Sequence, residues 1–320
     1  MAGSWARLTE SSAAVRFIDT NLRGSGQVML QDNPLTGLLF LIGIGWSAVV
    51  SGSPQLAIGA PVGLVVATCT AIGLGVDRTA LRSGLFGYNG MLVGMALSIY
   101  LAANPLFWAY LVVGAGISVV VMLAMVNIAK TWGVPVLTAP FVLTTWLMLL
   151  GSYNFAAISL ADLPPPALPS IHVASAMPLD SLALVDAALF GVSQVFFIGN
   201  AITGVIFLLA LLVSSRWAAA YALAGTVLAI AVAQTLGANS DAIAAGLFGF
   251  SPVLTAIAIG TMFDTPRPRV VFYVAAATIF TVITQAALNS ALMPLGIPVL
   301  TAPFVAVTWL FLLPLRKLVL

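Results

Sequence analysis

Four neutral polar side chains occur at matching places in the two halves of the chain and could bind a solute. Gln27 and Gln194 each precede a valine, and Thr138 and Thr301 each lie between two prolines. A glutamine amide offers one acceptor oxygen and two donor hydrogens, while a threonine hydroxyl both donates and accepts. Such groups bind neutral polar molecules through hydrogen bonds. Other roles stay open, because a glutamine can join two helices and a threonine can bond back to its own helix.

Aromatic and aliphatic side chains also recur at matching places and could supply flat apolar walls. Each copy of Gly-Leu-Phe-Gly, at 84–87 and 246–249, is followed by an aromatic residue and, one helical turn later, by a leucine. A planar polar solute needs such walls against its faces and acceptors along its edge, and amide-like molecules fit this description. General packing is the alternative role. The four residues are Tyr88, Phe250, Leu92 and Leu254.

Acidic and basic side chains are missing from the apolar part of the sequence. No Asp, Glu, Lys, Arg or His lies within the ten apolar runs, although pumps and ion-coupled carriers usually place ionisable groups inside the membrane. The sequence also lacks a phosphate-binding glycine loop and a Cys/His cluster. We therefore expect no catalytic residue, no cofactor and no metal site, and no functional role for the one histidine, His172. A passive pathway for a neutral solute is favoured over an enzyme.

The composition indicates that membrane-spanning helices hold these residues. Of the 320 residues, 61% are hydrophobic and only 6% are charged, which is too few charges to cover a soluble globular domain. Cys69, the single cysteine, lies in an apolar run and is expected to be a small core residue. Each run is close to the roughly 20 residues that cross the hydrocarbon core. The ten runs are 35–51, 55–76, 85–103, 105–129, 134–150, 200–215, 217–236, 246–263, 270–292 and 296–314.

The basic residues indicate how these runs are oriented. If the N-terminus is cytoplasmic and the ten runs alternate, all 11 Lys and Arg residues fall on the cytoplasmic side, a more complete separation than the positive-inside rule requires. The C-terminus is then cytoplasmic as well. The segment 151–185 contains Pro164-Pro165-Pro166 and no basic residue, so it is predicted to be an external linker.

Repeated motifs divide the chain into two related halves. All seven residues of Pro-Val-Leu-Thr-Ala-Pro-Phe at 135–141 recur at 298–304, and the two prolines of each copy interrupt a continuous helix. Because five spans are an odd number, the second half would enter the membrane in the opposite orientation, as in inverted-repeat transporters. We predict a first repeat at 1–150, the linker at 151–185 and a second repeat at 186–320.

One further element in each half is predicted to cross only part of the membrane. Residues 20–32 and 187–199 are too short and polar to span it, and each contains a matched Gln-Val pair. An amphipathic helix on the membrane surface is the alternative. The predicted fold is thus an all-α polytopic membrane protein, with ten transmembrane helices and two half-spanning pore helices around a central pore.

The chain contains Leu-Arg-Gly-Ser-Gly-Gln-Val at 22–28, Asn-Pro-Leu-Thr-Gly at 33–37, Gly-Leu-Phe-Gly-Tyr-Asn at 84–89 and Val-Pro-Val-Leu-Thr-Ala-Pro-Phe at 134–141, with their second-half equivalents. Together these motifs resemble the urea transporter family over nearly the whole chain from Leu22 onward. The resemblance implies a channel-like protein that passes urea down its gradient, assembled as a homotrimer with one pore per protomer. It also implies half-spanning pore helices. We expect a bacterial member in the inner membrane, with urea and membrane lipid as partners. No nucleic-acid partner is expected, since the basic residues are dispersed.

The resemblance assigns roles to individual residues. Gln27 and Gln194 would be the polar groups of two outer binding positions, and Thr138 and Thr301 would line the narrow centre. The walls of the slots that hold urea flat would come from Tyr88 with Leu92 and from Phe250 with Leu254, and Val28 and Val195 would lie beside the pathway.

Three positions depart from the family pattern or from the first copy of a motif. Some members have Glu where this chain has Gln194, so one charge is removed. Leu30 stands where the family often has an aromatic residue, while Phe197 holds the matching place, so one slot is expected to be less aromatic than the other. Ser251-Pro252 replaces the asparagine that follows the aromatic residue in the first copy.

Two other functions stay open at this point. A less selective pore for ammonia, water or short amides would use the same neutral polar groups. An ion-coupled secondary transporter could share the inverted-repeat plan, but it is less favoured because the apolar runs lack ionisable residues.

Overall fold

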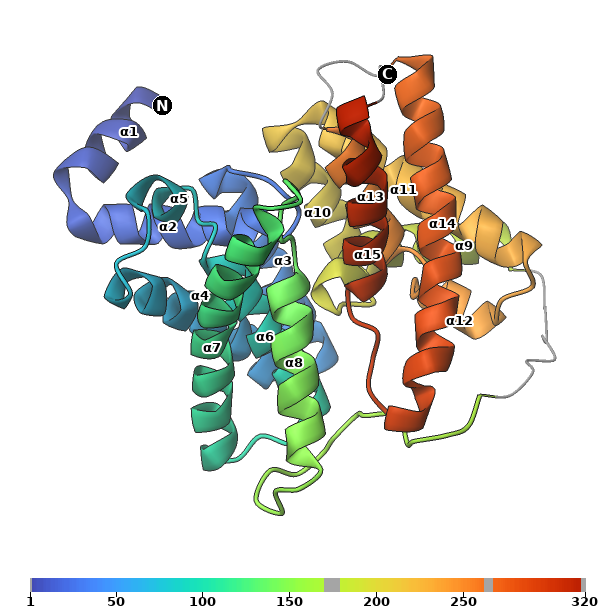
Figure 1. Cartoon of the computed structure of the whole chain (residues 1–320), viewed down its shortest axis with the longest axis horizontal. Helices are drawn as coiled ribbons and strands as arrows, with labels where there is room; N and C mark the ends of the chain where they lie inside the picture. The colour runs from blue at the N-terminus through green and yellow to red at the C-terminus, as the bar shows by residue number, and fades with distance from the viewer. Residues whose placement is uncertain (1, 170–178, 262–266, 318–320) are drawn as a thin grey trace.

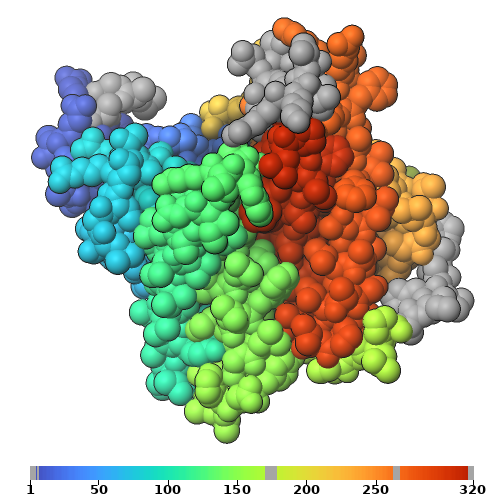
Figure 2. Space-filling model, viewed as in Figure 1, coloured from blue at the N-terminus to red at the C-terminus, as the bar shows by residue number. Residues whose placement is uncertain are grey.

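The computed structural model describes residues 2–169, 179–261 and 267–317, and these are almost entirely helical. Figure 1 shows the helices of the first half, in blue to green, beside those of the second half, in yellow to red. In the space-filling view, α7 (Pro105–Ala129) and α8 (Ala139–Ser152) in green meet α14 (Pro268–Leu292) and α15 (Ala302–Leu312) in orange and red along a seam that runs down this face (Figure 2). His172 lies outside the described residues.

Asparagine and proline residues set where several helices begin. α3 (Pro34–Ser51) starts with a proline after Asn33, whose side chain accepts hydrogen bonds from two amides of the first turn. α7 (Pro105–Ala129) repeats this arrangement with Asn104. Asparagine oxygens satisfy amides that have no partner within the helix, and proline suits a first helical turn. These caps fix the positions of the helices that surround the site.

Five of the described helices are long and apolar enough to cross a membrane, or six if a bent pair counts as one span. This agrees with the predicted α-helical polytopic membrane protein. The bent pair is α9 (Ser181–Ser193), with the short 3-10 helix η1 (Gln194–Phe196), and α10 (Ala201–Ser214), which meet at 71°. The five are α3, α4 (Pro54–Gly73), α7, α11 (Arg216–Thr235) and α14 (Pro268–Leu292).

The ten apolar runs do not form ten full-length helices. α6 (Gly87–Tyr100), α8 (Ala139–Ser152) and α10 have 14 residues each, whereas α13 (Phe250–Gly260) and α15 (Ala302–Leu312) have 11. At about 1.5 Å per residue, such helices are shorter than the ~30 Å hydrocarbon core. The reason is local: turns and extended backbone at the glycine and proline motifs occupy the start of most of these runs.

The elements expected to be half-spanning helices begin and end earlier than predicted. α2 (Ala13–Gln27) and α9 replace the predicted ranges 20–32 and 187–199. Their starts are capped by Ser12 and Asp180, whose side chains accept from amides of the first turn. Past their ends, Leu30 and Phe197 adopt positive φ angles of 63° and 61°, a left-handed conformation that helical residues do not adopt.

Five short elements complete the described fold. α1 (Ala2–Ser11) precedes α2, and α5 (Arg78–Arg82) and α12 (Ser240–Ala244) precede the Gly-Leu-Phe-Gly turns. Two 3-10 helices, η2 (Met293–Leu295) and η3 (Leu313–Lys317), follow α14 and α15.

The centre of the molecule is formed where α3 and α10 pack against each other. The rings of Phe40 and Phe207 lie 5.0 Å apart with an edge-to-face angle of 74°, and Phe196 lies near both. Two hydrogen bonds tie the same helices together: the Thr36 hydroxyl donates to the carbonyl of Ala210, and the Thr203 hydroxyl donates to the carbonyl of Gly43. The two halves therefore share one buried core.

Cys69 is exposed rather than buried, so its predicted core position was wrong. The buried face of α4 includes Leu64, Ala67, Thr68 and Ala71, and Cys69 lies on the opposite face. The sequence could not separate the two faces because α4 is apolar all round, which removes the amphipathic pattern that marks a core face.

Candidate functional site

The two copies of Pro-Val-Leu-Thr-Ala-Pro-Phe meet at the interface between the halves. In each copy the helix begins only after the threonine, and the preceding leucine has a positive φ: 54° at Leu137 and 52° at Leu300. The hydroxyl oxygens of Thr138 and Thr301 are 2.6 Å apart, and both residues are buried. The alternative that each threonine bonds back to its own helix is therefore wrong.

Two tryptophans satisfy backbone groups that the helix breaks leave free. The indole N–H of Trp146 donates to the carbonyl of Pro298 at 2.8 Å, and that of Trp309 donates to the carbonyl of Pro135 at 2.7 Å. A tryptophan of each half thus donates a hydrogen bond to the break of the other half. In a membrane, interrupted helices persist only where neighbouring groups satisfy the freed backbone in this way.

The two glutamines lie at the ends of α2 and α9, and each bonds to a backbone carbonyl of its own half. The Gln27 amide nitrogen donates to Ser83 O at 2.8 Å, and the Gln194 amide nitrogen donates to Ala245 O at 3.0 Å. These bonds orient the amides, because the nitrogen must face the carbonyl. Each acceptor oxygen, Oε1, has no donor among the described residues.

Glycines allow α2 and α9 to approach the Gly-Leu-Phe-Gly turns closely. Gly84 has a φ of 77°, and a Cβ placed on it would lie 2.2 Å from the backbone nitrogen of Gly24. At the matching place, a Cβ on Gly246 would lie 2.5 Å from the nitrogen of Gly191. Only glycine permits both this conformation and this contact. The motifs therefore set the distance between each glutamine and the carbonyl that holds it.

The residues predicted as slot walls are mostly buried beside the helix breaks. The Tyr88 hydroxyl donates to the carbonyl of Leu137 at 2.5 Å, so this wall is fixed against the first break. The Phe197 ring lies 6.1 Å from that of Phe141 and 6.4 Å from that of Tyr100. Leu92, Leu254, Val28 and Val195 are buried, whereas Leu30, Phe197 and Phe250 are partly exposed.

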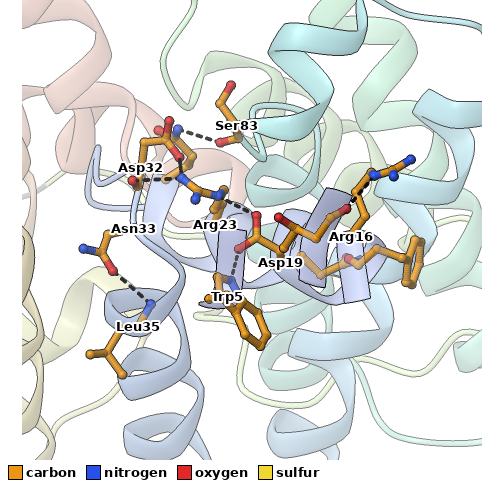
Figure 3. Close-up of polar contacts among 12 residues, drawn as sticks. Trp5, Arg16, Asp19, Arg23, Asp32, Asn33, Leu35 and Ser83 are labelled. Carbon is orange, nitrogen blue, oxygen red and sulfur yellow. Dashed lines mark hydrogen bonds and ion pairs between the residues drawn. The ribbon is translucent and has the colours of Figure 1, made fainter. Parts of the chain in front are cut away.

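A charged cavity of about 420 Å³ lies beside the Gln27 end of this arrangement. Arg23 forms ion pairs with Asp19 at 2.7 Å and Asp32 at 2.6 Å, and the indole of Trp5 on α1 donates to Asp19 (Figure 3). Burial alone would lower the pKa of Arg23, but the hydrogen bonds and charges of Asp19 and Asp32 outweigh burial and raise the pKa. Ser83, which holds Gln27, lines the same cavity.

A second cavity, of about 360 Å³, lies beside Phe197. It is bounded by Ser51 at the end of α3, by Ser53 just before α4, and by Asp162 of the predicted linker. One cavity thus lies beside the Gln27 end of the first half, and the other lies beside Phe197 of the second half.

The structure brings some of the predicted residues together and adds others. It joins Thr138 to Thr301, while each glutamine binds within its own half. The residues that sequence reasoning missed are Trp146, Trp309 and Asn89, whose side-chain oxygen accepts from the amide of Phe141 at 3.1 Å. The signal for the tryptophans was present, because Thr-Trp-Leu follows both copies of the proline motif. Among the described residues, no group of acidic, His or Cys side chains could hold a metal ion.

Comparisons with known proteins match nearly the whole chain. A family model described as urea transporter matches residues 18–316. Urea transporter 1 of Capra hircus is 34% identical over 315 residues, which cover 97% of this chain and 80% of that protein. Urea transporter 1 of Ovis aries is 33% identical with the same coverage, and that of Rattus norvegicus is 32% identical over 311 residues. Every residue predicted to line the site lies inside the matched range.

Proposed function

The chain belongs to the urea transporter family, and we propose that it conducts urea passively down its concentration gradient across the membrane. It is a transport protein and not an enzyme. The observation that carries the proposal is the contact of the Thr138 and Thr301 hydroxyls, 2.6 Å apart, where the two broken helices meet. A hydroxyl both donates and accepts, so each threonine can exchange its partner threonine for a passing solute.

The proposed pathway uses neutral groups in sequence. The in-plane N–H groups of urea would donate to the free Oε1 atoms of Gln27 and Gln194 at two outer positions. The side chains of Tyr88 with Leu92 and of Phe250 with Leu254 would hold the molecule flat. Between these two outer positions, urea would pass the threonine pair at the centre. Because the described long helices carry no acidic residue in their interiors, an ion would lose its hydration without compensation.

We further propose that the two halves form an inverted repeat, with 1–150 and 186–320 as repeats and 151–185 as an external linker. Reciprocal contacts support this arrangement: Trp146 and Trp309 each donate to the opposite break, and Thr36 and Thr203 each donate to the opposite central helix. In this proposal α2 and α9 are half-spanning pore helices around the central pathway.

The proposed orientation has both termini in the cytoplasm. It is supported by the one-sided distribution of Lys and Arg and by the view in Figure 1, where α1 and the end of α15 lie toward the same side of the molecule. Location in a bacterial inner membrane and assembly as a homotrimer with one pore per protomer are proposals that rest on the family resemblance. The mass of the solubilised particle tests the trimer.

Urea uptake by vesicles containing the purified protein tests the proposed function. We expect urea to enter these vesicles far faster than empty vesicles, with saturation only at high concentration, since a conducting site must release its solute readily. Comparison with formamide, ammonia and water fluxes determines how selective the pathway is. Uptake that depends on a proton or sodium gradient, or on membrane potential, would contradict a passive pathway.

A further inference from the structure

The two helix breaks differ in how their backbone groups are satisfied. In the first break, the Tyr88 hydroxyl donates to the carbonyl of Leu137 at 2.5 Å. Phe250 holds the matching place in the second half and has no hydroxyl. Among the described residues, none donates to the carbonyl of Leu300, although its φ of 52° matches that of Leu137. The Leu300 carbonyl of the second break therefore lacks the donor that the Leu137 carbonyl has in the first break.

The two breaks also differ in whether a backbone amide has an acceptor. In the first break, the Phe141 amide donates to the side chain of Asn89 at 3.1 Å. The matching amide, that of Phe304 in the first turn of α15, has no acceptor within the described part of the chain. Ser251 occupies the place of Asn89, is fully buried, and its hydroxyl has no partner. α13, which carries Ser251, packs against α15.

Buried polar groups without partners are rare in folded proteins, and ordered small molecules often satisfy them. Serine is shorter than asparagine, so the side chain of Ser251 does not bond to the Phe304 amide as the Asn89 carboxamide bonds to that of Phe141. The amides at the start of α15 also favour an acceptor atom, because they carry the positive end of the helix dipole.

We propose that the second break binds one small neutral molecule through the Leu300 carbonyl, the Phe304 amide and the Ser251 hydroxyl, and that the first break does not. The ligand must both donate to Leu300 and accept from Phe304, which is the chemistry of a permeating urea molecule or of a water molecule. The inference that urea is the ligand rests on the proposed function. It makes the pathway unequal, with the stronger hydrogen-bonding station in the second half.

The test compares wild type with two variants of this station. Phe250→Tyr places a hydroxyl where Tyr88 has one and should occupy the Leu300 carbonyl, while Ser251→Ala removes one polar group with little change in size. Tyr273→Phe is the matched control, because the Tyr273 hydroxyl also donates to a backbone carbonyl, that of Phe311, outside the proposed pathway. Urea flux into vesicles and a high-resolution cryo-electron microscopy map are measured for each protein.

If urea is the ligand, flux through Phe250→Tyr falls about fivefold, the effect of one hydrogen bond, and flux through Tyr273→Phe stays at the wild-type value. If water is the ligand, flux is retained, and the wild-type map has a water within about 3.2 Å of the Leu300 oxygen or the Phe304 nitrogen that is lost in Ser251→Ala. Unchanged flux together with an empty station overturns the proposal. Wild type that does not conduct urea refutes the proposed function instead, and the map then still decides whether the station is occupied.

Discussion

Replacement of Thr138 and Thr301 by valine, singly and together, tests the central contact most directly. Valine keeps the branched shape but removes the hydroxyl. Thr138 is 2% exposed and Thr301 3% exposed, so a single replacement leaves the remaining hydroxyl buried without a partner. Such a group costs about 1–3 kcal/mol, whereas removal of both partners is nearly neutral. We expect each single variant to lose about 1.5 kcal/mol and the double variant less than about 1 kcal/mol.

Flux and stability answer different parts of this prediction. Thermal unfolding of the purified variants measures the coupling energy, which is the sum of the two single losses of stability minus the loss in the double variant. This energy should be about 2 kcal/mol. Urea uptake by vesicles measures the pathway, and each variant should conduct about tenfold less, the equivalent of about 1.4 kcal/mol. Additive losses of stability would show that the hydroxyls do not meet. Wild-type flux in both single variants would show that they are packing groups outside the pathway.

Three further predictions concern the groups that position the site. Gln27→Leu removes the free acceptor oxygen and should lower urea flux about fivefold; a variant that conducts like wild type would place this side chain outside the pathway. Trp309→Phe removes the donor from the Pro135 carbonyl of the opposite break. Because this hydrogen bond is exposed, the unfolding free energy, measured in denaturant or by heating, should fall by about 0.5–1.5 kcal/mol, and no loss would mean that water replaces the indole. Gly84→Ala should lower the yield of folded protein sharply, because the added Cβ would lie 2.2 Å from the backbone of α2. The control is Gly75→Ala, since Gly75 has a similar φ of 66° but no atom within 4 Å of an added Cβ. Equal losses of yield in the two variants would assign the effect to backbone strain alone.

The sequence predicted which stretches are helical but placed the limits of several helices incorrectly, since α2 and α9 begin and end earlier than predicted and α6, α8, α13 and α15 are shorter than the predicted spans. The limits that could be predicted are those set by local groups. Proline at the start of α3 and α7, and asparagine before it, mark helix starts for reasons that act within one turn. The breaks were also predictable, since two prolines close together interrupt a helix wherever they occur. The duplicated threonine was therefore placed correctly at a break in each half.

What the sequence could not predict are the groups that meet between distant segments. The Trp146 indole bonds to a carbonyl 152 residues away, and no local pattern indicates which carbonyl that is. The exposed face of Cys69 was missed because α4 has no polar face. The left-handed conformation of Leu137 and Leu300 was also hidden, since leucine adopts it only when surrounding contacts enforce it.

Hydrogen bonds between the halves argue against a mechanism in which the halves rock relative to each other. The indoles of Trp146 and Trp309 each hold a carbonyl of the opposite break, and the Thr36 hydroxyl holds one of the opposite central helix. A rocking motion would separate these partners. The bond from Thr36 to Ala210 is buried, so breaking it would leave its groups without water at a cost of about 1–3 kcal/mol, whereas the bond of Trp309 is exposed and costs less to break. Rotation of the Thr138 and Thr301 hydroxyls breaks none of these bonds. Passage through a fixed framework, with movement confined to side chains at the centre, therefore fits this structure better than alternating access.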